Sequence, residues 1–202
     1  MVWLFRCSKR LIDIFGALVG LVFVVFLYPF ITLAIRLNSR GPELITLPRV
    51  SKGKIIQVYK FRSMQDGAYQ QKKDLLHLNE RNDGPFFKIK NDPRVTRVGK
   101  WLRKFRLDEF PQLINVLKGE LSLVGPRPHE PEEMYSYPMP YRHLLTAKAG
   151  VTGLSQVNGA SSLPFLKELE LDDFYIRHQS LWLDIKILFK TIAILFTDPT
   201  AV

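Results

Sequence analysis

The longest hydrophobic stretch of the chain covers residues 14–35, where 22 consecutive positions carry no charge and Val, Leu and Phe predominate. A helix of that length can cross the hydrocarbon core of a bilayer. The stretch is longer than the hydrophobic part of a typical signal peptide, and no small-residue cleavage site follows it. A core helix that is apolar on every face needs a large protein around it. The pattern therefore predicts a helix that resides in a membrane.

Basic residues flank this stretch on both sides: Arg6, Lys9 and Arg10 before it, and Arg36, Arg40, Arg49, Lys52 and Lys54 after it. The positive-inside rule favours both ends on the cytoplasmic side. Pro29 offers a bend, because proline removes a backbone donor and clashes with the preceding turn. Two arrangements stay open from this pattern. One is a helix that enters, bends and returns, and the other is a transmembrane anchor with a mild kink.

The rest of the chain predicts helices with a little strand. Ile55–Phe61 is β-branched and aromatic, and reads as a strand. Helical structure is expected in four stretches: polar residues 65–82, a basic amphipathic helix at 94–105, a short helix at 107–117 and a mostly helical region at 163–196. Turns and loops are expected where Gly and Pro gather: 82–85, 125–128, 129–140 and 148–159.

The last part of the helical region, 181–196, is strongly apolar and carries Lys186 and Lys190 four residues apart. Such a helix can lie in the headgroup plane of a membrane, with its lysines in the polar layer. A core helix of the soluble part is an equal alternative.

Composition and charge narrow the classes of partner. The 202 residues suit about one domain, and 29 Lys and Arg against 19 Asp and Glu give a formal net charge of +10. Such an excess indicates a polyanionic partner, which is nucleic acid, anionic lipid or a phosphorylated substrate. The single cysteine, Cys7, excludes an internal disulfide and a cysteine-cluster zinc site. No Walker loop or dinucleotide-binding fingerprint is present.

Asp108 and Glu109 are adjacent carboxylates in an unusually basic neighbourhood, formed by Lys100, Arg103, Lys104, Arg106 and Arg127. Such cations favour the ionised form of a carboxylate and can also hold a diphosphate. An ionised Asp can act as a nucleophile, and a second carboxylate can share a magnesium ion with phosphate oxygens. The structural alternative is that Asp108 is a helix N-cap, with Pro111 in the first turn. The two interpretations are compatible, because a helix N-terminus also binds anions.

Further basic side chains are candidates for phosphate binding. Arg127 lies between two prolines, so its backbone is stiff and its guanidinium can be aimed at a phosphate. A surface turn is the plain alternative. Lys60 and Arg62 share one face of the expected strand, where phosphate, lipid headgroup or solvent are all open. A nearby acidic group is interpreted as a solvated loop rather than a metal site: Glu130, Glu132 and Glu133.

Linked motifs run through nearly the whole chain: K-R-x-x-D-x-x-G-A from Lys9, K-F-R-S-M from Lys60, F-K-I-K-N-D-P-R-V-T-R-V-G from Phe87, R-x-x-x-L-D-E-x-P-Q-L from Arg103, G-P-R-P from Gly125, G-x-T-G-L-x-Q-V-x-G from Gly150 and D-x-x-Y-x-x-x-x-S-x-x-x-D from Asp172. Together they resemble the bacterial sugar transferases known as small monotopic phosphoglycosyl transferases. The set is far more specific than any one motif.

The resemblance implies roles for the matching residues. Asp108 is implied as the nucleophile that attacks the β-phosphate of a UDP-sugar and releases UMP. Glu109 is implied as its partner, near magnesium or in proton transfer, so that a Mg²⁺ cofactor lies on Asp108 and Glu109. Polyprenyl phosphate then takes the phosphosugar from Asp108 in a ping-pong scheme. The implied substrate-binding residues are Arg127, Arg103, Lys60, Arg62, Pro128 and Gln156.

The resemblance also implies the architecture and the partners. The fold is expected to be mainly α with minor β, in a monotopic membrane protein with amphipathic interfacial helices. Residues 1–38 form a re-entrant membrane helix hairpin, and residues 39–202 form the catalytic domain on the cytoplasmic face of the bacterial inner membrane. The implied partners are a UDP-sugar, polyprenyl (undecaprenyl) phosphate and the lipid membrane, with no nucleic acid. The sugar, the glycan pathway and the oligomeric state, a homodimer included, stay open.

Three positions differ from the residues that many relatives carry. Ala149 stands where many have Pro, Ala160 follows Asn158-Gly159 where many have Arg, and Tyr28 precedes the helix proline where Ser is common. The catalytic signature itself is intact.

Two other functions remain as alternatives. A glycosyl transferase that acts on the same lipid releases UDP, so the nucleotide product separates it from a phosphoglycosyl transferase. A basic membrane scaffold or nucleic-acid binder without catalysis fits the charge of +10. Nucleic-acid binding is the weaker alternative, because most aromatic residues fall in the membrane stretch or at helical core spacing rather than in a basic groove.

Overall fold

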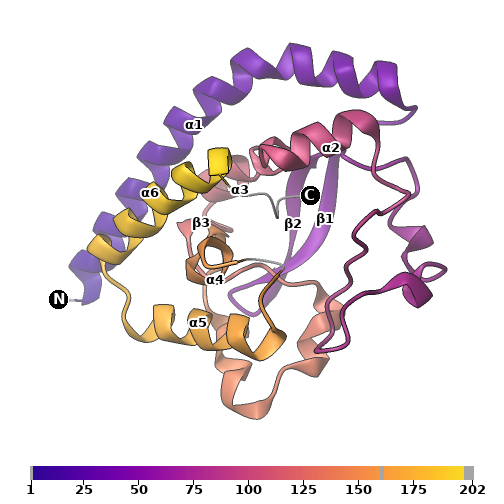
Figure 1. Cartoon of the computed structure of the whole chain (residues 1–202). Coiled ribbons are helices and arrows are strands. Elements are labelled where there is room, and N and C mark those ends of the chain that lie inside the picture. The colour runs from indigo at the N-terminus through magenta and orange to yellow at the C-terminus, as the bar shows by residue number, and fades with distance from the viewer. Residues whose placement is uncertain (1, 160–161, 198–202) are drawn as a thin grey trace.

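The computed structural model describes residues 2–159 and 162–197, which form a mainly helical fold with two small sheets (Figure 1). This confirms the coarse fold class expected from the sequence. The α-helices of this part are α1 (Val2–Asn38), α2 (Arg97–Lys104), α3 (Gln112–Lys118), α4 (Leu154–Val157), α5 (Phe165–Arg177) and α6 (Leu181–Thr197). The strands are the antiparallel pair β1 (Leu44–Ser51) and β2 (Lys54–Phe61), and the parallel pair β3 (Ser122–Val124) and β4 (Gly150–Thr152).

Helix α1 is continuous through Pro29 and bends over the rest of the molecule in Figure 1. By length and composition it is able to cross a membrane. Its inner face carries Ala17, Val24 and Ile31 at seven-residue spacing, followed by Ile35, and all four are buried. Because this spacing keeps a stripe on one face of a helix, α1 packs lengthwise on the folded body. Large apolar side chains on its other faces are exposed: Phe15, Val22, Phe23, Phe26 and Phe30.

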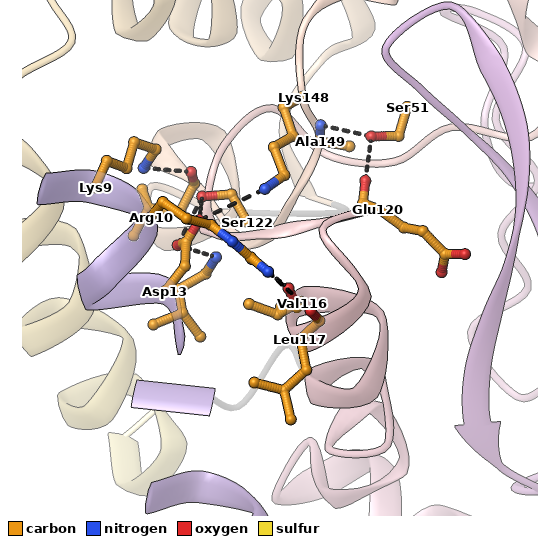
Figure 2. Close-up of polar contacts among 12 residues, drawn as sticks. Lys9, Arg10, Asp13, Ser51, Val116, Leu117, Glu120, Ser122, Lys148 and Ala149 are labelled. Carbon is orange, nitrogen blue, oxygen red and sulfur yellow. Dashed lines mark hydrogen bonds and ion pairs between the residues drawn. The ribbon is translucent and has the colours of Figure 1, made fainter. Parts of the chain in front are cut away.

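The K-R-x-x-D motif joins the N-terminal half of α1 to elements from the middle of the chain (Figure 2) and to α6 near its end. The Nζ atom of Lys9 donates to Oδ2 of Asp184 in α6 at 2.6 Å and to the carbonyl of Val124 in β3 at 3.0 Å. Arg10 donates to two carbonyl oxygens at the C-terminal end of α3, at 2.6 and 2.8 Å. These carbonyls lie in the last turn, where helical partners are missing, so the guanidinium caps α3.

Asp13 completes this set of contacts. Both of its carboxylate oxygens accept from the hydroxyl of Ser122 at 2.9 Å, and Oδ1 also accepts from the backbone N–H of Leu123 at 2.8 Å. The ammonium of Lys148 lies 3.7 Å from Oδ2. Asp13 is only 3% exposed, so these contacts join α1 to β3 in the interior.

Strands β1 and β2 form a hairpin in which Ser51 pairs with Lys54. The turn residues Lys52 and Gly53 have positive φ angles of 53° and 68°, as two-residue hairpin turns favour. Strand β2 confirms the strand expected from the sequence. Strand β1 is not among the elements expected from the sequence, and it contains Pro48. Proline is tolerated there since β1 is an edge strand.

The helix expected at 65–82 is wrong. That stretch contains only the 3-10 turns η1 (Gln70–Lys72) and η2 (Leu76–Leu78), none of whose residues is buried. Gly67 also interrupts it, with a left-handed φ of 74°. Ala68 is the one side chain of this polar stretch that is buried, so a helix there would gain little from packing, and short helices without packing are marginal in water.

The single helix expected at 107–117 is also wrong. The stretch divides into the 3-10 turn η3 (Leu107–Glu109) and helix α3, whose N-cap position is occupied by Pro111. The expected basic helix before it is confirmed as α2. The Thr96 hydroxyl caps α2 by accepting from the backbone N–H of Gly99 at 2.9 Å.

Helix α6 lies beside α1 in Figure 1. Asp184 and Ile187 are buried on its inner side, whereas Trp182, Phe189 and Ile192 are exposed. The helix therefore has a packed face, as the core alternative requires, and also an exposed apolar surface, as the membrane-interface alternative requires.

Candidate active site

Asp108 and Glu109 lie on turn η3, between the end of α2 and the start of α3. Arg106 precedes the turn with a left-handed backbone, φ 52°, so the chain reverses there. Asp108 is 8% exposed. The N-cap interpretation of Asp108 is wrong, because α3 starts after Pro111 and neither η3 nor α3 has a side-chain cap bond in the described part of the chain. A buried carboxyl without a capping role is a candidate for function.

The end of β2 brings Lys60 to this turn. Its Nζ atom donates to Oε1 of Glu109 at 2.5 Å, and both side chains are only partly exposed. Although burial opposes ionisation, the charge and hydrogen bond of Lys60, together with Arg127 and Arg106, lower the pKa of Glu109 to about 2. The expectation that the basic surroundings keep a carboxylate ionised is therefore confirmed for Glu109.

At Asp108 the cations act in the same direction but meet a stronger opposing effect. Burial has the largest influence on this carboxyl and raises its pKa, and the charge of Glu109 adds to the rise. Lys60 and Arg103 act in the opposite direction, but burial outweighs them. Asp108 therefore ionises more readily when further positive charge comes close to it.

Arg103 and Arg62 have different surroundings. The Nε atom of Arg103 donates to the hydroxyl of Ser63 at 3.0 Å, and its charge acts on Asp108. Arg62 is 2% exposed, and its guanidinium donates to the carbonyls of Ser39 and Arg40, just after α1. In its described contacts Arg62 joins the exit of α1 to the end of β2. Ser63 lies in the K-F-R-S-M motif but was not among the expected site residues, because a single hydroxyl after a strand indicates no particular chemistry.

The G-P-R-P turn brings Arg127 towards the same carboxylates. The backbone N–H of Gly150 donates to the carbonyl of Pro126 at 2.8 Å. A side chain at Gly150 would meet the backbone nitrogen of Gly125 at 2.1 Å, so this close approach of turn and strand requires glycine. The charge of Arg127 contributes to the lowered pKa of Glu109, which places the guanidinium within electrostatic reach of the carboxylate pair.

The remaining expected site residues are less distinctive. Pro128 is half-buried at the end of the turn. Gln156 is buried, and its amide donates to the carbonyl of Val151 at 3.1 Å. Ala149 belongs to the main hydrophobic core and also lines a small cavity together with Arg127. Ala160 lies outside the described residues.

The acidic group after the turn is not the solvated loop that the sequence predicts. It forms the 3-10 helix η4 (Pro131–Ser136), and Glu130 and Glu133 build a capping box at its start. Glu130 is also paired with Lys72 at 2.5 Å. Of the three carboxylates only Glu132 is exposed. The contacts of Glu130 and Glu133 are therefore structural.

The donor set for a metal is limited to two carboxylates. No group of three or more His, Cys, Asp or Glu side chains that could hold an ion occurs within residues 2–159 and 162–197. Asp108 and Glu109 offer carboxylate oxygens, although one oxygen of Glu109 is bonded to Lys60. Magnesium binds through one or two carboxylates together with substrate phosphates, so these residues fit an ion that is shared with a bound diphosphate.

Comparison with known proteins identifies the family. The model of the family described as Bacterial sugar transferase matches residues 4–198, and the chain belongs to this family. It is 42% identical over 196 residues to the galactosyl transferase CpsE of Streptococcus agalactiae, and 39% identical over 194 residues to the undecaprenyl-phosphate galactose phosphotransferase of Salmonella typhimurium. It is 38% identical over 209 residues to the UDP-glucose:undecaprenyl-phosphate glucose-1-phosphate transferase of Escherichia coli.

These alignments cover 96%, 92% and 97% of this chain, but only 43%, 40% and 42% of the three relatives. The chain thus spans about two fifths of the length of these curated relatives. The family expected from the sequence motifs is confirmed.

Proposed function

We propose that this chain transfers a sugar-1-phosphate from a UDP-sugar to polyprenyl phosphate and so begins the assembly of a bacterial surface glycan. The observation that carries the proposal is the state of Asp108. Its carboxyl is buried, does not cap α3, and interacts electrostatically with Lys60, Arg103 and Glu109. Relatives that are named for sugar-phosphate transfer to undecaprenyl phosphate support the same activity.

The reaction follows as two displacements at one phosphorus atom. A carboxylate oxygen of Asp108 attacks the β-phosphorus of the UDP-sugar, the P–O bond to the α-phosphate breaks, and UMP leaves with the electron pair. Asp108 then carries the phosphosugar as a mixed anhydride. An oxygen of polyprenyl phosphate attacks the same phosphorus and the bond to Asp108 breaks, which restores the carboxylate and gives the polyprenyl-diphosphate sugar.

The neighbouring groups serve these two displacements. Arg127 and Arg103 balance the phosphate charge, which fixed cations do most effectively where water is scarce. Glu109, ionised and held by Lys60, is too weak a base to take a proton from the acceptor phosphate, and its carboxylate instead serves as a ligand for a metal ion. A magnesium ion on Asp108 and Glu109 neutralises phosphate charge when it is bound.

The product nucleotide tests the proposed reaction. Detergent-solubilised protein is incubated with magnesium, undecaprenyl phosphate and a panel of UDP-sugars, and UMP and UDP are quantified separately. Release of UMP with one donor supports phosphoglycosyl transfer and names the sugar. Release of UDP would instead identify a glycosyl transferase. Absence of both from folded protein would count against catalysis by this chain.

Removal of the divalent ion is expected to stop turnover. With EDTA in excess we expect UMP release to fall by at least about 100-fold, because the diphosphate charge is then left to Arg127 and Arg103 alone. Addition of Mg²⁺ beyond the EDTA should restore the rate, whereas the same amount of Na⁺ should not. An EDTA-treated enzyme with an unchanged rate would contradict the magnesium site on Asp108 and Glu109.

We also propose that α1 is a re-entrant helix with both ends at the cytoplasmic face. Lys9 at one end is bonded to Asp184 at 2.6 Å, and Arg36 at the other end is paired with Glu43, just before β1, at 2.8 Å. A straight crossing would carry one end about 30 Å from the folded body. The bend, the inward buried stripe and the exposed outer face support a helix that dips into the membrane and returns.

Cysteine labelling distinguishes the two topologies. In inside-out membrane vesicles, a membrane-impermeant maleimide is expected to label both Cys7, which is partly exposed, and a cysteine introduced by Asn38→Cys in a Cys7→Ser background. In sealed right-side-out vesicles neither position should react until detergent is added. Labelling of the two positions from opposite sides would contradict the re-entrant helix.

A further inference from the structure

A buried carboxyl behind the G-P-R-P turn has no part in the proposed displacement steps. Asp172 of α5 is 1% exposed. Its Oδ1 atom accepts from the hydroxyl of Ser155 at 2.7 Å, and its Oδ2 atom accepts from the backbone N–H of Arg127 at 3.2 Å. Burial raises the pKa of Asp172 to about 7, and the charge of Glu168 acts in the same direction. Burial of a carboxyl costs free energy because the group loses its hydration, so we expect Asp172 to have a role beyond packing.

The sequence of the turn gives this contact its importance. Pro126 and Pro128 have no backbone N–H, so the N–H of Arg127 is the one backbone donor in residues 126–128. Asp172 takes that donor. The bond therefore joins the turn to α5, next to the carbonyl of Pro126 that is held by Gly150, and acts on the residue whose side chain leaves the backbone at this point.

Carboxylates from two parts of the fold act on the guanidinium of Arg127. Burial opposes its charge, but Glu168 of α5 and Glu109 of the candidate active site raise its pKa, with smaller effects from Glu133 and Asp172. Arg127 and Asp172 also line the same small cavity. The titratable side chains that interact with Asp172 are Glu168 and Tyr175 on the same helix, and His129, Tyr137 and Arg127 on other elements.

We propose that Asp172 is a positioning residue: by holding the backbone N–H of Arg127, it fixes where the guanidinium meets the diphosphate of the nucleotide donor. The inference rests on the proposed function, because it takes Arg127 to bind the donor. It assigns a role to the first residue of the closing D-x-x-Y-x-x-x-x-S-x-x-x-D motif. Asp172 touches no substrate in this role and acts only through Arg127.

If Asp172 acts through Arg127, the effects of the two substitutions on donor binding should not be additive in a double-mutant cycle. If Asp172 only aims the guanidinium, its loss should weaken donor binding when Arg127 is present and have no further effect once the guanidinium is removed. A merely structural role would weaken binding by the same factor in both backgrounds. The probe is UDP, which carries the diphosphate and needs no knowledge of the sugar.

The experiment measures UDP affinity by calorimetry for the full-length chain in detergent with Mg²⁺. We expect Asp172→Leu to raise the Kd for UDP by about tenfold, the scale on which orienting hydrogen bonds act at metal-ligand sites. In the Arg127→Met background the same change should alter the Kd by less than about twofold. Asp172→Asn keeps an oxygen that can accept from Arg127, and should stay within about threefold of wild type.

Asp173→Leu is the matched control, because Asp173 is the next residue of α5 and pairs on the protein surface with Arg177 at 2.7 Å. It should leave the Kd for UDP unchanged in both backgrounds. A wild-type Kd for Asp172→Leu, or equal losses in the two backgrounds, would overturn the positioning role. If wild type itself binds no UDP, the proposed function fails and the inference fails with it. Should Asp172→Leu not fold, Asp172→Ala replaces it in the same cycle.

Discussion

The substitution Asp108→Asn is expected to reduce UMP release by about 1,000-fold or more, the loss typical when a covalent nucleophile is removed. The amide keeps the shape of the side chain but has no carboxylate oxygen to attack phosphorus. Burial raises the pKa of Asp108, so the pocket already disfavours its charge and should accept a neutral isostere. Activity should therefore disappear while the melting temperature is maintained.

Covalent labelling extends this test to the intermediate. With a donor labelled in the sugar and no acceptor lipid, wild type should retain label on the protein and Asp108→Asn should retain none. Asp74→Asn is a matched control, because Asp74 is exposed and lies on the polar stretch before α2. It should release UMP at the wild-type rate. A variant Asp108→Asn with more than a tenth of wild-type activity would remove Asp108 from the role of nucleophile.

The substitution Asp13→Ala is expected to destabilise the protein by about 3–5 kcal/mol, the usual cost of breaking a buried charged network by removing one partner. The change leaves the hydroxyl of Ser122 and the N–H of Leu123 without their acceptor and Lys148 without its nearest carboxylate (Figure 2). Unfolding in detergent, followed by circular dichroism against temperature or urea, measures the change.

Asp13→Asn separates the hydrogen bonds from the charge. One amide oxygen can still accept from Ser122 or Leu123, so its loss of stability should be clearly smaller than that of Asp13→Ala. If Asp13→Ala costs less than about 1 kcal/mol, the apolar stripe and the contacts of Lys9 and Arg10 hold α1 without a net contribution from Asp13. A large loss would mean that α1 belongs to the same cooperative unit as the catalytic residues, and that removal of this helix removes more than a membrane anchor.

Local patterns in the sequence determined the elements that depend on their own periodicity and the family that depends on linked motifs. The apolar run of α1, the basic amphipathic helix α2 and the β-branched strand β2 each follow from side chains that are neighbours along one element. The helix predicted for the polar stretch 65–82 does not form, because helix propensity is not enough where almost no side chain packs against the rest of the protein. The carboxylate pair at 108–109 was visible because its basic neighbours are close in the sequence.

Tertiary structure alone decided which of these charged residues belong to the pocket. Lys60 and Arg62 are two residues apart, yet one is bonded to Glu109 and the other to the end of α1. Whether Asp108 caps a helix depended on where α3 begins, and its pKa depended on burial, which no local pattern reports. The contact of Asp172 with Arg127 joins positions 45 residues apart. Periodicity is a property of one element, whereas burial and long-range hydrogen bonds exist only after distant elements pack together.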